Sequence, residues 1–171
     1  TQTASDSASL DFTSGITSTY GEYIFKFYNI NPATDTATFG FQCNATDSTS
    51  YDETITSSFF RAFHHEVGYS PGLLYNGLFD QAQGTGLQAL SEEQGGDADE
   101  HCAGTLHLFN PSSTTYVKHF IGRMTVIHYH PVAVDAFMGG YINTTTAIDD
   151  IKFYMSSGNF DGTIKMWGVK K

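Results

Sequence analysis

The sequence predicts an all-β protein, an antiparallel two-sheet β-sandwich of the jelly-roll type, folded as one domain over residues 1–171. Aromatic residues make up 15% of the chain, and together with Thr, Val and Ile they favour the pleated surface of a sheet. Apolar and polar side chains alternate in most stretches, which gives each predicted strand one apolar face. Two sheets packed through such faces would bury them, whereas the strands of a parallel α/β sheet are apolar on both sides.

The predicted strands follow one another with turn residues between them, and no helical repeat of apolar residues interrupts the series. They cover residues 7–12, 20–30, 37–43, 53–67, 73–79, 105–109, 116–130 and 134–142, followed by two strands within 145–171. This spacing of strands and turns is typical of a sandwich or a barrel.

Two neighbouring pairs of strands are predicted to form antiparallel hairpins. Residues 20–30 place Tyr and Phe side chains on one face, and a turn containing Pro32 leads directly into 37–43. Within 145–171, a Ser-Ser-Gly-Asn turn separates two alternating stretches. That segment is therefore predicted to be a hairpin that closes the fold.

The segment 80–104 differs from the rest of the chain because it is acidic and poor in apolar side chains. We expect it to be an exposed insertion in the domain. The whole chain has a net charge of −10 with only eight Lys and Arg, so it lacks the basic face that binding to nucleic acid requires. The same charge disfavours an anionic membrane surface, and no apolar run approaches the ~20 residues of a membrane-spanning helix.

The two cysteines, Cys43 and Cys102, are too few for a disulfide scaffold. Two free thiols and a single disulfide bridge both fit the sequence. No Gly-x-Ser-x-Gly elbow and no phosphate-binding Gly-rich loop is present, so no catalytic residue and no cofactor are expected.

Histidine offers the main alternative to a non-enzymatic function. His128 and His130 are two residues apart in a predicted strand, which would place both imidazoles on one face. Their spacing from Gly122 and Asp135 resembles the first half of the cupin metal motif, although no later histidine follows. The alternative is therefore a cupin-like metal-dependent enzyme with His128 and His130 as ligands, while the primary expectation is that no metal is bound.

Three stretches of the sequence, taken in order, resemble a family of small β-rich virion structural proteins of tailed bacteriophages, especially marine phages. They are DFTSGITSTYGEYIFKFYNINPATD, GTLHLFNPSSTTYVKHF and TTAIDDIKFYMSSGNFDGTIKMWGVKK. The resemblance implies a jelly-roll-like sandwich exposed on the particle, as a capsid decoration or fibre protein or as a tail-fibre, receptor-binding protein. It carries no catalytic residue.

The expected partners are other virion proteins of the capsid or tail, in a particle assembled in the bacterial cytoplasm, and further copies of the chain, with a trimer favoured. Exposed aromatic residues, among them Phe59-Phe60 and Tyr141, offer apolar interface area. A surface that contacts a host glycan, as a carbohydrate-binding module would, is expected at Tyr69, Tyr75, Tyr129 and Asp135.

Overall fold

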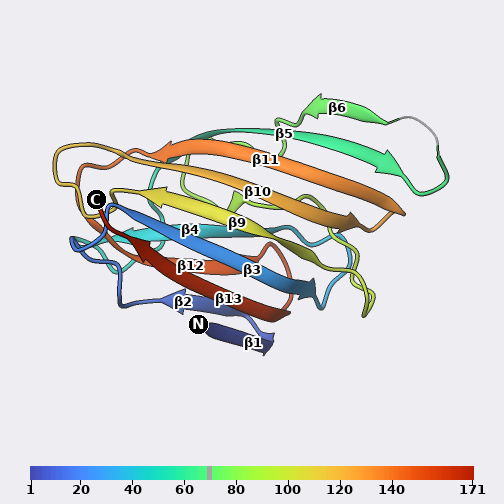
Figure 1. Cartoon of the computed structure of the whole chain (residues 1–171), viewed down its shortest axis with the longest axis horizontal. Coiled ribbons are helices and arrows are strands. Elements are labelled where there is room, and N and C mark those ends of the chain that lie inside the picture. The colour runs from blue at the N-terminus through green and yellow to red at the C-terminus, as the bar shows by residue number, and fades with distance from the viewer. Residues whose placement is uncertain (69–70) are drawn as a thin grey trace.

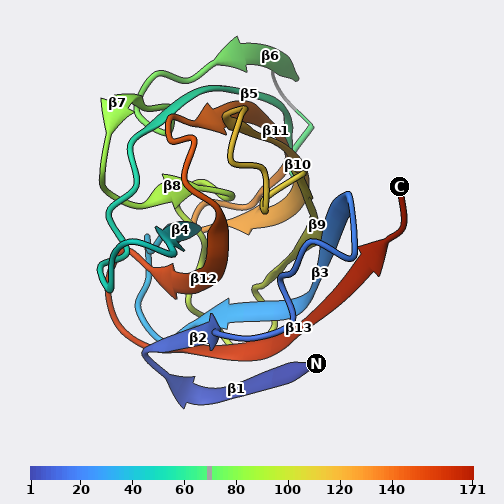
Figure 2. The ribbon, with the colours of Figure 1, turned by 90° about the vertical axis from the view of Figure 1, so that its left-hand side faces the viewer.

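The computed structural model describes residues 1–68 and 71–171, and over these residues it confirms the all-β sandwich. The strands form one large and one small antiparallel sheet packed face to face (Figures 1 and 2). No helix occurs among the described residues, so none has the length and apolarity that a membrane crossing requires. The strands are β1 (Gln2–Ser7), β2 (Ser9–Phe12), β3 (Glu22–Pro32), β4 (Phe39–Ala45), β5 (Ile55–His65), β6 (Gly72–Tyr75), β7 (Ala82–Gly84), β8 (Gln88–Ala89), β9 (Cys102–Phe109), β10 (Lys118–His128), β11 (Val132–Ile142), β12 (Ile148–Met155) and β13 (Phe160–Val169).

Four antiparallel pairings give the fold its jelly-roll connectivity. β1 pairs with β13, β2 with β12, β3 with β9 and β4 with β8. These pairings nest in sequence, as they do when one long antiparallel ribbon winds over itself into two sheets. The ribbon alternates between the sheets, so β1, β13, β3 and β9 are neighbours in the large sheet and β2, β12, β4 and β8 form the small one.

The large sheet extends beyond the jelly roll. After β9 come β10, β11, β5 and β6, and β7 also pairs with β5. β9, β10 and β11 form a meander, whereas β5 to β7 belong to the connection between β4 and β8. The extension has an inner face that continues the core and an outer face that is turned away from the small sheet.

The two sheets meet through aromatic side chains. Phe153 on β12 is fully buried, and its ring centroid lies 5.2 Å from those of Phe25 and Phe27 on β3. Phe39 on β4 packs against Phe27 in an edge-to-face contact at 5.4 Å. These geometries are the favoured ones for aromatic pairs, so Phe153 is the centre of the inter-sheet core.

Both predicted hairpins are wrong. β3 lies in the large sheet and β4 in the small one, and the same is true of β13 and β12. Each connection is an arch between the sheets, which lets the apolar faces of the two strands meet across the core instead of lying side by side. Thr36 and Gly158, both with positive φ, lie in the two connections, but such residues permit arches and hairpins equally.

The prediction that 80–104 is an exposed acidic insertion is also wrong for its central part. Residues 88–92 are buried, including Glu92 at 1% exposure. Gln94 bridges to Ala37, next to β4, and to His128 on β10, and so joins the two sheets along one side. The segment covers the inner face of the extension. Hydrogen bonds hold part of its buried polar groups, among them the Ser91 hydroxyl and the Gln94 amide N–H, whereas Oε1 of Gln88, Glu92 and Gln94 is buried without a hydrogen-bond partner among the described residues.

Candidate functional site

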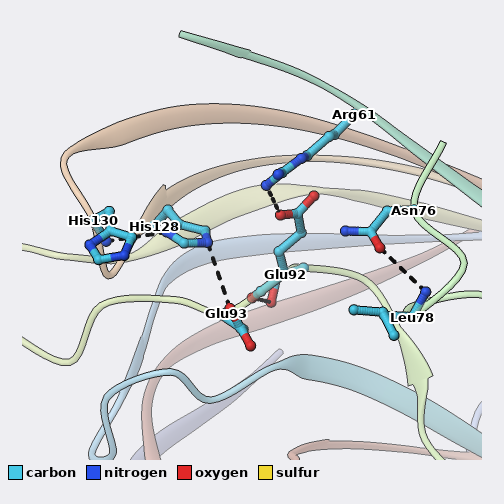
Figure 3. Close-up of polar contacts among 8 residues, drawn as sticks. Arg61, Asn76, Leu78, Glu92, Glu93, His128 and His130 are labelled. Carbon is cyan, nitrogen blue, oxygen red and sulfur yellow. Dashed lines mark hydrogen bonds and ion pairs between the residues drawn. The ribbon is translucent and has the colours of Figure 1, made fainter. Parts of the chain in front are cut away.

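The histidine pair lies at one end of β10, beside the buried segment (Figure 3). His128 is the last residue of β10, but His130 lies in the turn before β11, so the prediction that both share one face of a strand is wrong. The two ring centroids are 5.8 Å apart. The backbone N–H of His130 donates a hydrogen bond to Nδ1 of His128 at 3.2 Å, which engages that nitrogen within the protein.

The surroundings of His128 favour a neutral imidazole. Burial lowers the pKa of His128 to about 4, and the nearby charges of Arg61 and His130 act in the same direction. Nε2 lies 3.9 Å from a carboxylate oxygen of Glu93. Among residues 1–68 and 71–171, no group of three His, Cys, Asp or Glu side chains is placed to hold a metal ion.

Next to the histidines, Arg61 on β5 forms an ion pair with Glu92 (Figure 3). The Glu92 side chain is 2% exposed and that of Arg61 is 19% exposed. Burial raises the pKa of Glu92, and the attraction of Arg61 partly opposes that rise. This ion pair attaches the buried segment to the inner face of the extension. Its role is therefore structural.

Hydrogen bonds between uncharged groups attach the same segment to the small sheet. Ser91 Oγ accepts hydrogen bonds from the backbone N–H of Phe39 and from the Gln94 amide, each at 2.9 Å. Both partners are buried. The polar cluster therefore holds three parts of the fold together, and the sequence could not reveal it because its members lie on β4, β5, β10 and the segment after β8.

Cys43 and Cys102 are free thiols, so the alternative of a disulfide bridge is excluded. Both side chains are fully buried, and burial raises their thiol pKa values far above the ordinary range. A thiol of this kind is unreactive, because the thiolate is the nucleophile.

Lys118 on β10 is a buried cation at the other end of the strand. Its ammonium group donates hydrogen bonds to the carbonyl oxygens of Thr144 at 3.0 Å and Thr146 at 2.5 Å. Burial lowers the Lys118 pKa. These contacts fix the loop between β11 and β12.

The predicted contact residues do not gather at one site. The Tyr75 hydroxyl on β6 donates to Asp80. The Tyr129 ring packs at a tilt against that of the next residue, His130, at a centroid distance of 4.0 Å, whereas Asp135 on β11 accepts two hydrogen bonds from Arg123, at 2.9 and 2.6 Å. Tyr69 lies outside the described residues.

A broad apolar surface lies instead on the outer face of the large sheet. Ile121 is 53% exposed, Trp167 43% and Phe60 40%. The Phe60 and Phe137 rings stack in parallel across β5 and β11 at 4.9 Å, and the Arg123 guanidinium covers the Phe137 ring at 4.9 Å. We call these five residues, together with Tyr28, the outer-face patch.

One continuous row of directly opposed residues runs across this face from β6 to β13. An open hollow of about 430 Å³ is lined by four residues of this row and by Gly139, and a second hollow of about 460 Å³, lined by other residues such as Ala133, lies on the same strands. The row consists of Tyr75, Phe60, Phe137, Arg123, Thr105, Lys26 and Lys165.

The outer-face patch is also rich in cations. Lys26 lies over the Trp167 ring at 5.4 Å, and Lys165 over the Tyr28 ring at 5.1 Å. Both are cation–π contacts. In a chain with a net charge of −10, this surface stands out as apolar and positively charged.

No protein-family model matches this sequence, and none of the curated proteins matches it.

Proposed function

We propose that this protein is a non-enzymatic structural protein on the surface of a tailed-bacteriophage virion, as a capsid decoration or fibre protein or a tail-fibre, receptor-binding protein. The three stretches that resemble such proteins support the proposal. They contain β3, most of β9, β12 and β13. β13, β3 and β9 are direct neighbours in the large sheet and β12 belongs to the small one, so the resemblance covers strands of both sheets of the jelly roll.

The observation that carries the proposal is the outer-face patch. Monomeric proteins rarely expose large contiguous apolar surfaces, and such surfaces usually mark contacts with other macromolecules. Aromatic residues and Arg are the side chains that protein interfaces favour. We infer that the patch contacts another copy of the chain or another virion protein.

The arrangement of the aromatic rings favours protein over sugar as the ligand of this face. A pyranose ring stacks on an aromatic face that is open to solvent. Phe137 has one face against Phe60 and the other against Arg123, so the two rings stand on edge. Their exposed edges and the neighbouring Ile121 suit an apolar side-chain contact.

The proposal is tested by mass spectrometry of purified virions from the phage that encodes the chain. We expect the protein in intact particles at a defined copy number, in the hundreds for a capsid decoration and in the tens or fewer for a fibre. Absence of the chain from intact particles would refute the proposal.

The contribution of the outer-face patch is tested by Ile121→Glu, which places a charge in its centre. We expect this variant to fold and to be strongly depleted from particles, since a buried unpaired carboxylate opposes binding. Thr49→Glu, at an exposed position in the loop after β4, is the matched control and is expected to be incorporated normally. Equal incorporation of both variants would remove the patch from the interface.

A further inference from the structure

The edge of the large sheet formed by β6 differs from the other sheet edges of the described residues. β1 is polar, β2 contains Asp11, β7 has only small and polar residues, and β8 is a buried strand of two residues. β6 has the sequence GLLY, and its Leu73, Leu74 and Tyr75 are 74%, 46% and 56% exposed. Proteins normally protect an exposed edge with charge, Pro or a cover, because unpaired backbone groups invite another strand.

The backbone of β6 presents hydrogen-bonding groups on its free side. The Asn76 N–H donates to the Phe59 carbonyl at 2.9 Å, which identifies a hydrogen-bonded pair of the antiparallel ladder. Such pairs alternate with non-bonded ones, and Leu74, two residues before Asn76, is paired with Arg61. The backbone N–H and C=O groups of Leu74 therefore point toward β5. The N–H and C=O groups of Leu73 and Tyr75 therefore point away from β5, where no other described strand pairs with β6.

We propose that β6 pairs with β6 of a second copy of this chain, antiparallel about a two-fold axis at Leu74. In this register Leu73 of each copy forms a hydrogen-bonded pair with Tyr75 of the other. The two Leu74 residues form the non-bonded pair, in which side chains approach most closely. The pairing joins the two large sheets into one and continues the outer-face row, whose apolar end lies at β6, across the axis, because Leu73 and Tyr75 share that face.

The absence of charge on β6 allows a second copy to pair with it. Copies of a chain with a net charge of −10 repel one another, so they can associate only where acidic groups are absent or neutralised. β6 has no charged residue, and the nearby Asp80 accepts a hydrogen bond from the Tyr75 hydroxyl. β6 has apolar side chains on both of its faces, with Leu73 and Tyr75 on one and Leu74 on the other, so a second β6 matches it on both. The inference does not depend on the proposed virion function.

Cysteine cross-linking tests the register. A non-bonded antiparallel pair brings two Cβ atoms within the range of a disulfide, so Leu74→Cys should form a covalent dimer rapidly when copper(II)-phenanthroline is added as oxidant. Leu78→Cys is the matched control, because it is 87% exposed but lies outside β6. The native Cys43 and Cys102 are buried and should not react. Equal cross-linking of the two variants would overturn the proposed register.

Backbone blocking tests the pairing itself. Leu73→Pro removes an N–H that points away from β5, so the ladder with β5 stays intact while two intermolecular hydrogen bonds per dimer are lost. We expect sedimentation velocity to show a wild-type dimer and an association weakened ~30-fold by Leu73→Pro, whereas Leu73→Thr, which keeps the N–H, still dimerises.

A wild-type chain that stays monomeric, or a trimer that both Leu73 variants leave unchanged, would overturn the proposal. Either result would leave incorporation into virions untouched, so failure of the pairing can be told apart from failure of the proposed function.

Discussion

Replacing Arg61 by Met is expected to destabilise the protein far more than replacing Arg123 by Met. The two arginines are closely matched, because each lies on the large sheet, pairs with one carboxylate and covers a phenylalanine ring, at 4.8 and 4.9 Å. They differ in the burial of the partner. The Glu92 side chain is 2% exposed, whereas that of Asp135 is 28% exposed.

The expected magnitudes follow from this difference in burial. A carboxylate left buried without its partner costs about 3–5 kcal/mol, while an exposed pair contributes about 0–1 kcal/mol. In a chain of this size, each kcal/mol changes the Tm by about 2–4 °C. Arg61→Met should therefore lower the Tm by roughly 6–20 °C, and Arg123→Met by at most about 4 °C.

The pH dependence identifies Glu92 as the cause. Its pKa is raised in the folded protein, and loss of Arg61 raises it further, so the penalty appears as the pH rises through that folded pKa and is absent below the unfolded one. Loss of the Arg61 charge also relieves its repulsion of protonated His128, which again favours the variant in acid. The defect should thus be large at pH 7.5 and small at pH 4.5.

Urea unfolding followed by far-UV circular dichroism measures these free energies, each variant being compared with wild type at the same pH. Equal destabilisation by the two arginine variants at pH 7.5, or a defect of Arg61→Met that persists in acid, would refute the reasoning.

Three further predictions concern the core and the buried titratable groups. Phe153→Ala should lower the free energy of unfolding by about 3–5 kcal/mol, and Phe153→Leu by much less, because the ring fills the centre between the sheets; urea unfolding that shows less than about 1 kcal/mol for Ala would contradict this. The pKa of His128 is lowered from 6.5 to about 4 in the folded protein, so this residue supplies stability above pH 6.5 that is lost as the pH falls toward 4. Between pH 7.5 and 4.5, the free energy of unfolding of His128→Gln should therefore fall by up to about 3 kcal/mol less than that of the wild type. Cys43 and Cys102 should react with a thiol reagent only after denaturation, and fast labelling of the native protein would contradict their burial.

The β character of the chain could be predicted from sequence because an alternation of period two is a local property. The connectivity could not, because it depends on which sheet a strand joins after a turn. The connections through Thr36 and Gly158 contain turn residues that suit a hairpin, yet the chain crosses to the other sheet at both. The crossing brings Phe27 against Phe39 through the core, a contact that strands paired side by side in one sheet would not make.

Composition misled the prediction for 80–104 because a count of polar residues does not register their hydrogen bonds. Glu92 reads as a solvent-exposed acid until Arg61, 31 positions earlier, is placed beside it. Ser91 and Gln94 are likewise buried in a network with the backbone of β4. These contacts between residues distant in sequence form because the large sheet extends beyond the small one and the segment covers the inner face of that extension.

The outer-face patch, in contrast, left a detectable signal in the sequence. Adjacent residues of a strand face opposite sides, so Phe59 and Phe60 cannot both belong to the core. The expectation that both are exposed is wrong for Phe59, which is fully buried, whereas Phe60 is 40% exposed. The same alternation holds for Phe137 between the buried Ala136 and Met138. In a strand with one buried face, alternate residues fill the core. A large apolar residue at one of the outward-facing positions between them does not contribute to that core. Such residues recur on β5, β10, β11 and β13, and the sheet order aligns them on one face, as the proposed contact with a partner requires.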